Sequence, residues 1–190
     1  LTVFENHMKS MTELIRALRI GRLEAEDHYD PEIHDAYFNH FDWQSFSDSE
    51  MSFCAPVLMI TSIETLMDHG LTEFSKMLAS HIPVKTLVIK QDVRPTHPAG
   101  ASGEIQFSFP QELGAMAVSH RNTYVFQSSS IHPKDLYDGF SRGISNLSPA
   151  LFYILSPQDE PEGHSYVWAG AALESRVFPE FAYDQRRGVQ

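Results

Sequence analysis

The residues that first suggest chemistry follow a short apolar run in the stretch CAPVLMITSIETLMDHGLTEFSKML, residues 54–78. The run VLMI, residues 57–60, is typical of a strand buried on both faces of a parallel sheet. A helix is expected over about 62–79, with one apolar face formed by Met67, Leu71, Phe74 and Leu78. A strand that leads straight into a helix often holds a phosphate, because the amides of the helix N-terminus point at the anion. Residues 61–66, TSIETL, contain none of the glycines that let backbone approach such an anion.

The same residues fit a capping box, Thr61-x-x-Glu64. In this pattern the Thr61 hydroxyl accepts from the amide of Glu64, and the Glu64 carboxylate accepts from the amide of Thr61. Such a cap contributes about 1 kcal/mol and places a negative charge at the positive end of the helix dipole. It predicts a helix start that repels anions. The alternative, that Thr61 and Glu64 are ordinary helix-start residues, stays open.

Other groups with chemical potential carry weaker signals. Ser128, Ser129 and Ser130 precede His132, but the G-x-S-x-G elbow of a serine nucleophile is missing, which argues against hydrolase chemistry. In a Pro-rich loop, Arg94 and His97 favour loop packing, with binding of a small anion as the alternative. Three histidines spaced six residues apart match no zinc pattern, and we expect no metal site: His28, His34 and His40.

The elements that must position these residues alternate along the chain. A helix over 5–23 precedes a polar, acidic and aromatic segment at 24–53. Strands are then expected at 57–60, 84–89, 124–127 and 150–155, with an extended FAYD at 181–184. Helices are expected at 62–79, 111–118, 133–146 and near 169–176, with a loop over 90–110. This order predicts an α/β fold, a three-layer sandwich with a central, mostly parallel sheet.

The segment 24–53 is unusual in composition. Between Glu24 and Glu50 there are nine acidic residues and no Lys or Arg, so it forms a solvated acidic surface or, as the alternative, a face that meets a basic partner. Four aromatic side chains are expected to pack it onto the body of the domain: Phe38, Phe41, Trp43 and Phe46.

Composition excludes several classes of protein. The formal net charge of −11 disfavours nucleic-acid or anionic-membrane binding, because phosphate contacts need many Lys and Arg. A single cysteine, Cys54, excludes an internal disulfide framework and an all-cysteine cluster. No apolar run approaches the ~18 residues of a membrane span, and no signal peptide is visible, so a cytoplasmic location is expected. The chain starts at Leu1 without an initiator Met, which favours a fragment of a larger protein.

Seven segments in the same order resemble a known family: FENHMKSMTELIRALR, YDPEIHDAYFNHFDWQSF, CAPVLMI, GLTEFSKMLASHIPVKTLVI, ELGAMAVSHRNTYVFQSS, GFSRGISNLSPALF and ALESRVFPEFAYD. Together they resemble the thiamine-diphosphate-binding domain of pyruvate:ferredoxin (flavodoxin) oxidoreductases and related large 2-oxoacid oxidoreductases. The resemblance implies one domain over 1–190 of the thiamine-diphosphate-binding fold type, or a partial copy of it, with the α/β core at 54–184. In the family, this domain holds the cofactor pyrophosphate through a divalent cation, and a second domain covers the other end.

The resemblance also shows where this sequence departs from the family. The G-D-G motif that ligates the cation falls on Ser62, Ile63 and Glu64, so the acidic ligand position is an isoleucine. The N-T-G-G loop begins at Thr96 and His97, where no Asn or Thr-Gly pair is kept. The cysteine that the family carries after the strand matching ALFYIL is also missing from SPQDEPEGHSY.

These departures predict a degenerate site and a pseudoenzyme domain. We expect no bound thiamine diphosphate or magnesium, no catalytic residues, and a role as an assembly or interaction module within a 2-oxoacid oxidoreductase-like protein. Its partners would be other domains of the same protein or a second copy in a homodimer; ferredoxin or flavodoxin enters by resemblance alone. Two alternatives remain: a functional half-site of a thiamine-diphosphate-dependent enzyme, and a binder of another small ligand in the same cleft.

Overall fold

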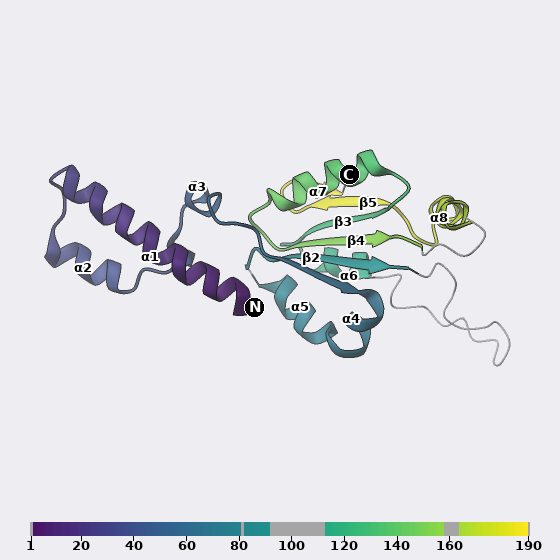
Figure 1. The fold of residues 1–190 in the computed structure, drawn as a ribbon, viewed down its shortest axis with the longest axis horizontal. Coiled ribbons are helices and arrows are strands. Elements are labelled where there is room, and N and C mark those ends of the chain that lie inside the picture. The colour runs from purple at the N-terminus through teal and green to yellow at the C-terminus, as the bar shows by residue number, and fades with distance from the viewer. Residues whose placement is uncertain (1, 81, 92–112, 158–163, 190) are drawn as a thin grey trace. The chain divides into compact units, whose positions relative to one another are not determined.

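The computed structural model describes residues 2–80, 82–91, 113–157 and 164–189. The chain divides into two compact units, Leu1–Val57 and Leu58–Gln190, and each is considered by itself. Figure 1 shows the helices of the first unit and the sheet of the second. Most of the loop expected at 90–110, with Arg94, Thr96 and His97, lies outside the described residues.

The first unit is helical. Its elements are α1 (Thr2–Ala25), α2 (Pro31–Asn39), the 3-10 turn η1 (Trp43–Ser45) and α3 (Asp48–Met51). The helix expected over 5–23 is confirmed, and it runs through Gly21 to Ala25. A glycine inside a helix costs only about 1 kcal/mol, which the packing of the helix can offset.

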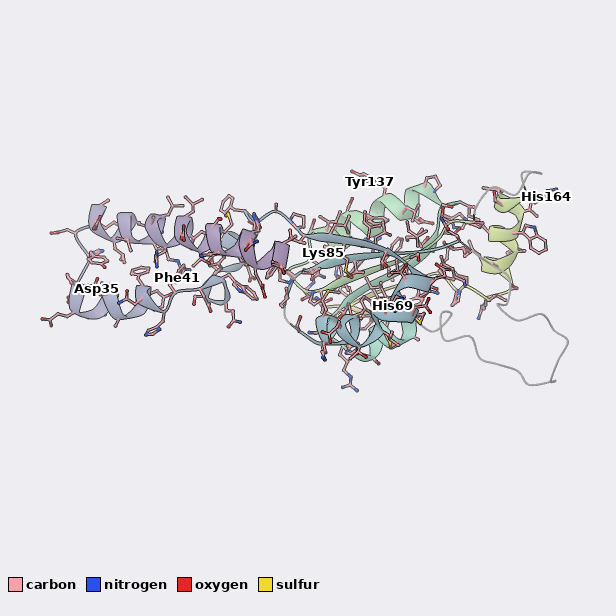
Figure 2. All side chains as sticks on the ribbon, turned by 60° about the horizontal axis from the view of Figure 1, so that its bottom comes forward. Asp35, Phe41, His69, Lys85, Tyr137 and His164 are labelled. Atoms are coloured by element: carbon pink, nitrogen blue, oxygen red, sulfur yellow. The ribbon has the colours of Figure 1, made fainter. Side chains whose placement is uncertain are left out.

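Aromatic residues of the segment 24–53 pack against α1. Phe38 and Phe41 form a buried cluster with Ile15, and Phe41 lies between α1 and α2 (Figure 2). The ring of Trp43 meets that of Phe4 edge-on, with centroids 5.3 Å apart. Within the first unit, these aromatic side chains pack against α1.

An arginine on α1 also holds this segment. Arg19 donates from Nε and Nη2 to the two carboxylate oxygens of Glu50, at 2.8 and 2.6 Å, and from Nη1 to the hydroxyl of Tyr37 at 3.0 Å. Its guanidinium lies 4.9 Å from the centre of the Phe41 ring. The hydrogen bonds from Arg19 lower the pKa of Glu50 to about 2. One cation thus anchors part of a strongly acidic segment.

The second unit is an α/β fold with a six-stranded sheet in the order β1-β2-β4-β3-β5-β6. The strands are β1 (Leu58–Ser62), β2 (Lys85–Lys90), β3 (Tyr124–Ser129), β4 (Ala150–Leu155), β5 (Phe181–Asp184) and β6 (Gly188–Val189). The helices are α4 (Ile63–His69), α5 (Leu71–Ala79), α6 (Leu113–Ser119), α7 (Pro133–Ile144) and α8 (Ser165–Glu174). The first four strands pair in parallel, and β5 and β6 add antiparallel pairs.

The mostly parallel sheet has helices on both sides, as expected for a three-layer arrangement. Figure 1 shows α7 on one side and α4, α5 and α6 on the other. Side-chain alternation agrees: Gly139 of α7 lies against Phe126, whereas Gly114 of α6 lies against Gln127, the next residue of β3. Both glycines are needed because an added Cβ would collide with these side chains.

Two expected elements differ in detail. The helix expected over 62–79 is interrupted at Gly70, which ends α4 and begins α5. The last expected helix begins earlier, at Ser165. The strands expected at 84–89, 124–127 and 150–155 are confirmed as β2, β3 and β4.

The first strand is exposed, and the expectation of burial on both faces was wrong. Among the strands that the structure describes, it lies at the edge and pairs with β2 alone. Leu58, Met59 and Ile60 are 46%, 37% and 61% exposed. Through the register with β2 and β4, Leu58 and Ile60 face the same side as Phe152 and α7, but α7 packs over β3 and β4. An apolar run alone cannot distinguish a central strand from an edge strand.

A charged residue is buried at the amino end of β2, opposite Leu58 of β1. Lys85, 2% exposed, lies among the strands (Figure 2). Its Nζ donates to the carbonyl oxygens of Asn146 and Ser148, the latter at 2.6 Å. Burial lowers the pKa of Lys85 to about 8. These bonds fix the turn between α7 and β4.

Candidate functional site

The candidate residues of the sequence gather at the carboxyl ends of the parallel strands, where α/β folds usually hold their ligands. Ser62 pairs with Ile89, Ile89 with Ile154, and Ile154 with Ser128, so the two serines lie in one row across the sheet. Three strand spacings separate them, about 14 Å. The groups at 61–64 and at 128–132 are therefore two separate sites.

At the first site, the strand β1 turns directly into α4. Ser62, and not Thr61, is the N-cap residue: its Oγ accepts from the amide of Thr65 at 3.2 Å and lies 3.1 Å from the Thr65 hydroxyl. The predicted Thr61–Glu64 capping box is wrong, because the strand continues two residues further than expected, to Ser62. Thr61 is still in β1 and its hydroxyl donates to the Ser62 carbonyl at 3.3 Å.

The next residue carries the main chemical consequence. Ile63 is 2% exposed and points into the core beneath α4. Glu64 is exposed in the first turn of α4. Its charge also reaches Tyr153, whose pKa is raised first by burial and then by Glu64. The site thus combines a helix capped by its own serine, a buried alkyl group and a carboxylate.

Thr96 and His97, together with Arg94, lie outside the described residues. Asp68 is exposed in the last turn of α4, one helical turn from Glu64. Within the described ranges, no group of three or more His, Cys, Asp or Glu is arranged to hold a metal ion.

The second site contains a residue that the sequence analysis missed. Glu180, just before β5, accepts from the Ser128 hydroxyl at 2.7 Å, from the Ser129 amide at 3.3 Å, and lies 2.9 Å from His132 Nδ1. It is separated from these residues by about fifty positions in the chain, and its only sequence signal is its place before the extended FAYD. Only the antiparallel pairing of β5 with β3 brings it there.

This cluster is not a nucleophile site. The Ser128 hydroxyl donates to the carboxylate and not to the imidazole, and the Ser129 hydroxyl donates to the Leu155 carbonyl at 3.1 Å. A serine nucleophile needs a base that takes its proton, and here both hydroxyls are bonded elsewhere. The cluster therefore connects β3, the start of α7 and the residue before β5 through hydrogen bonds.

Comparison with known proteins adds no relative. Neither a scan against protein-family models nor a search of curated proteins finds a match for this chain. None of the described helices combines the length and the apolar character needed to cross a membrane. The geometry of the two sites, and the α/β fold that positions them, are the grounds on which a function can be proposed.

Proposed function

We propose that this chain is a degenerate cofactor domain of a 2-oxoacid:ferredoxin or flavodoxin oxidoreductase-like protein, which serves as an assembly module and not as a catalyst. The observation that carries the proposal is the segment 58–64. Its first half is an exposed apolar strand, and its second half is a helix start with no place for a magnesium diphosphate.

The loss of cofactor binding follows from coordination chemistry. Magnesium takes oxygen ligands in a near-octahedral arrangement. The side chain of Ile63 has no oxygen and is directed into the core. The Thr65 amide at the helix start is already bonded to the Ser62 hydroxyl. A diphosphate placed at this corner would also meet the negative charge of Glu64.

The assembly role follows from the exposure of β1. An edge strand presents unpaired backbone groups, and natural edges are usually blunted by charge, proline or a covering element. Here the three residues Leu58, Met59 and Ile60 are all apolar and exposed. Such an edge suits pairing with a strand of another domain of the same protein, or with β1 of a second copy. A cytoplasmic location belongs to the same proposal, since the free Cys54 is ordinary for a reducing compartment.

Two measurements test the two parts of the proposal, which are the loss of cofactor binding and the assembly role. Titration with thiamine diphosphate and magnesium, followed by calorimetry, should give no saturable heat. A saturable, magnesium-dependent heat would instead favour a functional half-site and end this proposal.

For the assembly half, sedimentation equilibrium should show association of the chain that rises with concentration. Ile60→Lys should abolish it, whereas Tyr137→Lys, which changes an exposed residue of α7, should not. A monomer at all concentrations would exclude the homodimer. The version with another domain would then be tested by Ile60→Lys in the parent polypeptide, which should weaken its assembly.

A further inference from the structure

One side of the sheet is covered over β3 and β4 but open over β1 and β2. On this side α7 packs against β3 and β4, and the Phe140 ring stacks on the Phe152 ring with centroids 4.3 Å apart. In the parallel register, Phe152 pairs with Leu87 and Leu87 pairs with Ile60, so these three side chains point to the same side. Ile60 is nevertheless 61% exposed, and Leu87 is only half-buried.

The opposite side of the same strands is covered. Thr86 and Val88 of β2, which point away from α7, are both 0% exposed, and α4 packs against β1 and β2 there (Figure 1). Leu87 and Ile89, which point toward the α7 side, are half-buried. Parallel sheets of α/β folds have helices on both faces. Within the residues that the structure describes, the layer on the α7 side therefore lacks a helix over β1 and β2.

A flank of α7 forms an apolar wall beside this open area. Leu87 packs in the same apolar cluster as Leu136 and Phe140, so this flank of the helix faces β2. Ile144 lies one helical turn after Phe140 on the same flank and is 44% exposed. Floor and wall together, which we call the open slot, comprise six uncharged side chains: Leu58, Ile60, Leu87, Ile89, Phe140 and Ile144.

The open slot has the dimensions of one short helix. Neighbouring strands lie about 4.8 Å apart, so β1 and β2 give a floor about 10 Å wide, close to the diameter of an α-helix. The five residues of β1 give a length of about 17 Å, which matches about 11 helical residues. A floor of about 170 Å² is well below the ~800 Å² that each partner buries in a stable dimer. The open slot is therefore too small to hold a second copy by itself.

We propose that the open slot binds an amphipathic α-helix of a partner polypeptide, with leucine, isoleucine or valine side chains on the bound face. Such a helix would lie beside α7 at the usual distance between helix axes, about 8–10 Å, and would complete the layer over the sheet. Apolar grooves commonly recognise amphipathic helices in this way. This helical partner is distinct from the proposed pairing of the β1 edge, because it contacts the face of β1 and β2.

The test uses the full chain and a synthetic peptide of about 15 residues, the length at which an isolated helix becomes marginally stable. Its leucines recur at i, i+3, i+4 and i+7, and equal numbers of Lys and Glu leave it without net charge. The reference peptide has the same composition with the leucines spread around the helix. Fluorescence anisotropy should show saturable binding of the patterned peptide, clearly tighter than that of the reference. The circular dichroism of the patterned peptide should gain helix on binding.

Two substitutions in the open slot should weaken this binding: Ile60→Gln in the floor and Ile144→Gln in the wall. The loss should be about fivefold for each, as expected for half the burial of an isoleucine side chain. Met59→Gln is the matched control, because Met59 is a 37% exposed residue of β1 that points to the other side of the sheet. Val167→Gln, which changes an exposed apolar residue of α8, is a second control. Both should leave binding unchanged, and melting temperatures report whether each variant is folded.

Ile144 lies outside the β1 edge, so its variant separates this proposal from the edge pairing. The sedimentation of Ile144→Gln should match that of the unchanged chain. Loss of self-association in Ile144→Gln would assign the open slot to a second copy and overturn the proposal. The absence of saturable binding, or equal binding of the two peptides, would also overturn it. An equal effect of Met59→Gln and Ile60→Gln would indicate a strand at the β1 edge in place of a helix on the face, with the same consequence.

Discussion

Placing an acidic residue at position 63 should unfold the domain and should not create a magnesium site. Ile63 is 2% exposed beneath the first turn of α4, so Ile63→Asp would place a carboxylate inside the core. The variant has the side chain that the resembled family uses, but the wrong surroundings for it. We expect a large loss in the free energy of unfolding and no gain in magnesium or thiamine diphosphate binding.

The magnitude has two parts. Removing a buried isoleucine side chain costs about 2–5 kcal/mol. Keeping the introduced carboxyl neutral at pH 7, against its ordinary pKa near 3.9, costs up to about 4 kcal/mol at 1.36 kcal/mol per pH unit. The sum is comparable with the whole stability of a typical domain, about 5–15 kcal/mol.

The second part depends on pH, and its sign can be predicted. A buried carboxyl has a folded-state pKa raised above its unfolded value, so its penalty is absent below the unfolded pKa and grows as the pH rises. Ile63→Asp should therefore lose less stability near pH 4 than at pH 7. Ile63→Asn, a neutral control of similar shape, should lose about the same amount at both values.

The measurement is urea unfolding, at several pH values, of the unchanged chain and of the Ile63→Asp and Ile63→Asn variants. Ile63→Val sets the scale for a conservative change, at about 1 kcal/mol. If Ile63→Asp loses less than that at pH 7, or if it binds magnesium and thiamine diphosphate, the side chain does not point into the core and the reasoning about this site is wrong.

Two further perturbations test the packing and the first unit. The low pKa of Glu50, about 2, means that its bond with Arg19 stabilises the first unit above the unfolded pKa and is lost as the pH falls toward 2. Hydrogen exchange of the α1 amides should show this loss, about 2 kcal/mol, and Glu50→Gln should remove the pH dependence; an unchanged profile would contradict it. Gly139→Ala should cost about 1–3 kcal/mol, because its Cβ would meet the Phe126 ring. By contrast, Gly170→Ala, with open space around it, should be neutral or stabilising by up to about 1 kcal/mol, and melting curves that reverse this order would refute the packing described for α7.

Local patterns were sufficient for most elements of the second unit. The strands β2, β3 and β4 are short runs rich in apolar and β-branched residues, and α7 starts at Pro133, where proline suits a first helical turn. The break at Gly70 was missed because the apolar residues keep their helical spacing across Gly70, although the helix itself ends there. The error at Thr61 has a similar origin, since a capping pattern one residue away, Ser62 with Thr65, is equally compatible with the sequence.

The two clusters of the second unit could not be found in this way. Glu180 and Ser128 meet only because β5 pairs antiparallel with β3. The cavity lined by Arg142, Asp184 and Arg186 joins residues of α7 to a turn more than forty positions later. Neither has a local spacing that would signal it, because side chains from distant elements meet through the sheet order and not through chain proximity.

The sequence by itself determined the α/β class, the order of the strands along the chain and the lack of glycines in residues 61–66. These follow from periodicity and residue type, which act over a few neighbouring residues. The tertiary structure alone decided that β1 lies at the edge of the sheet, that Ile63 points into the core, and that three arginines share one cavity. Each of these depends on which elements lie side by side, and that choice is made by the packing of the whole unit.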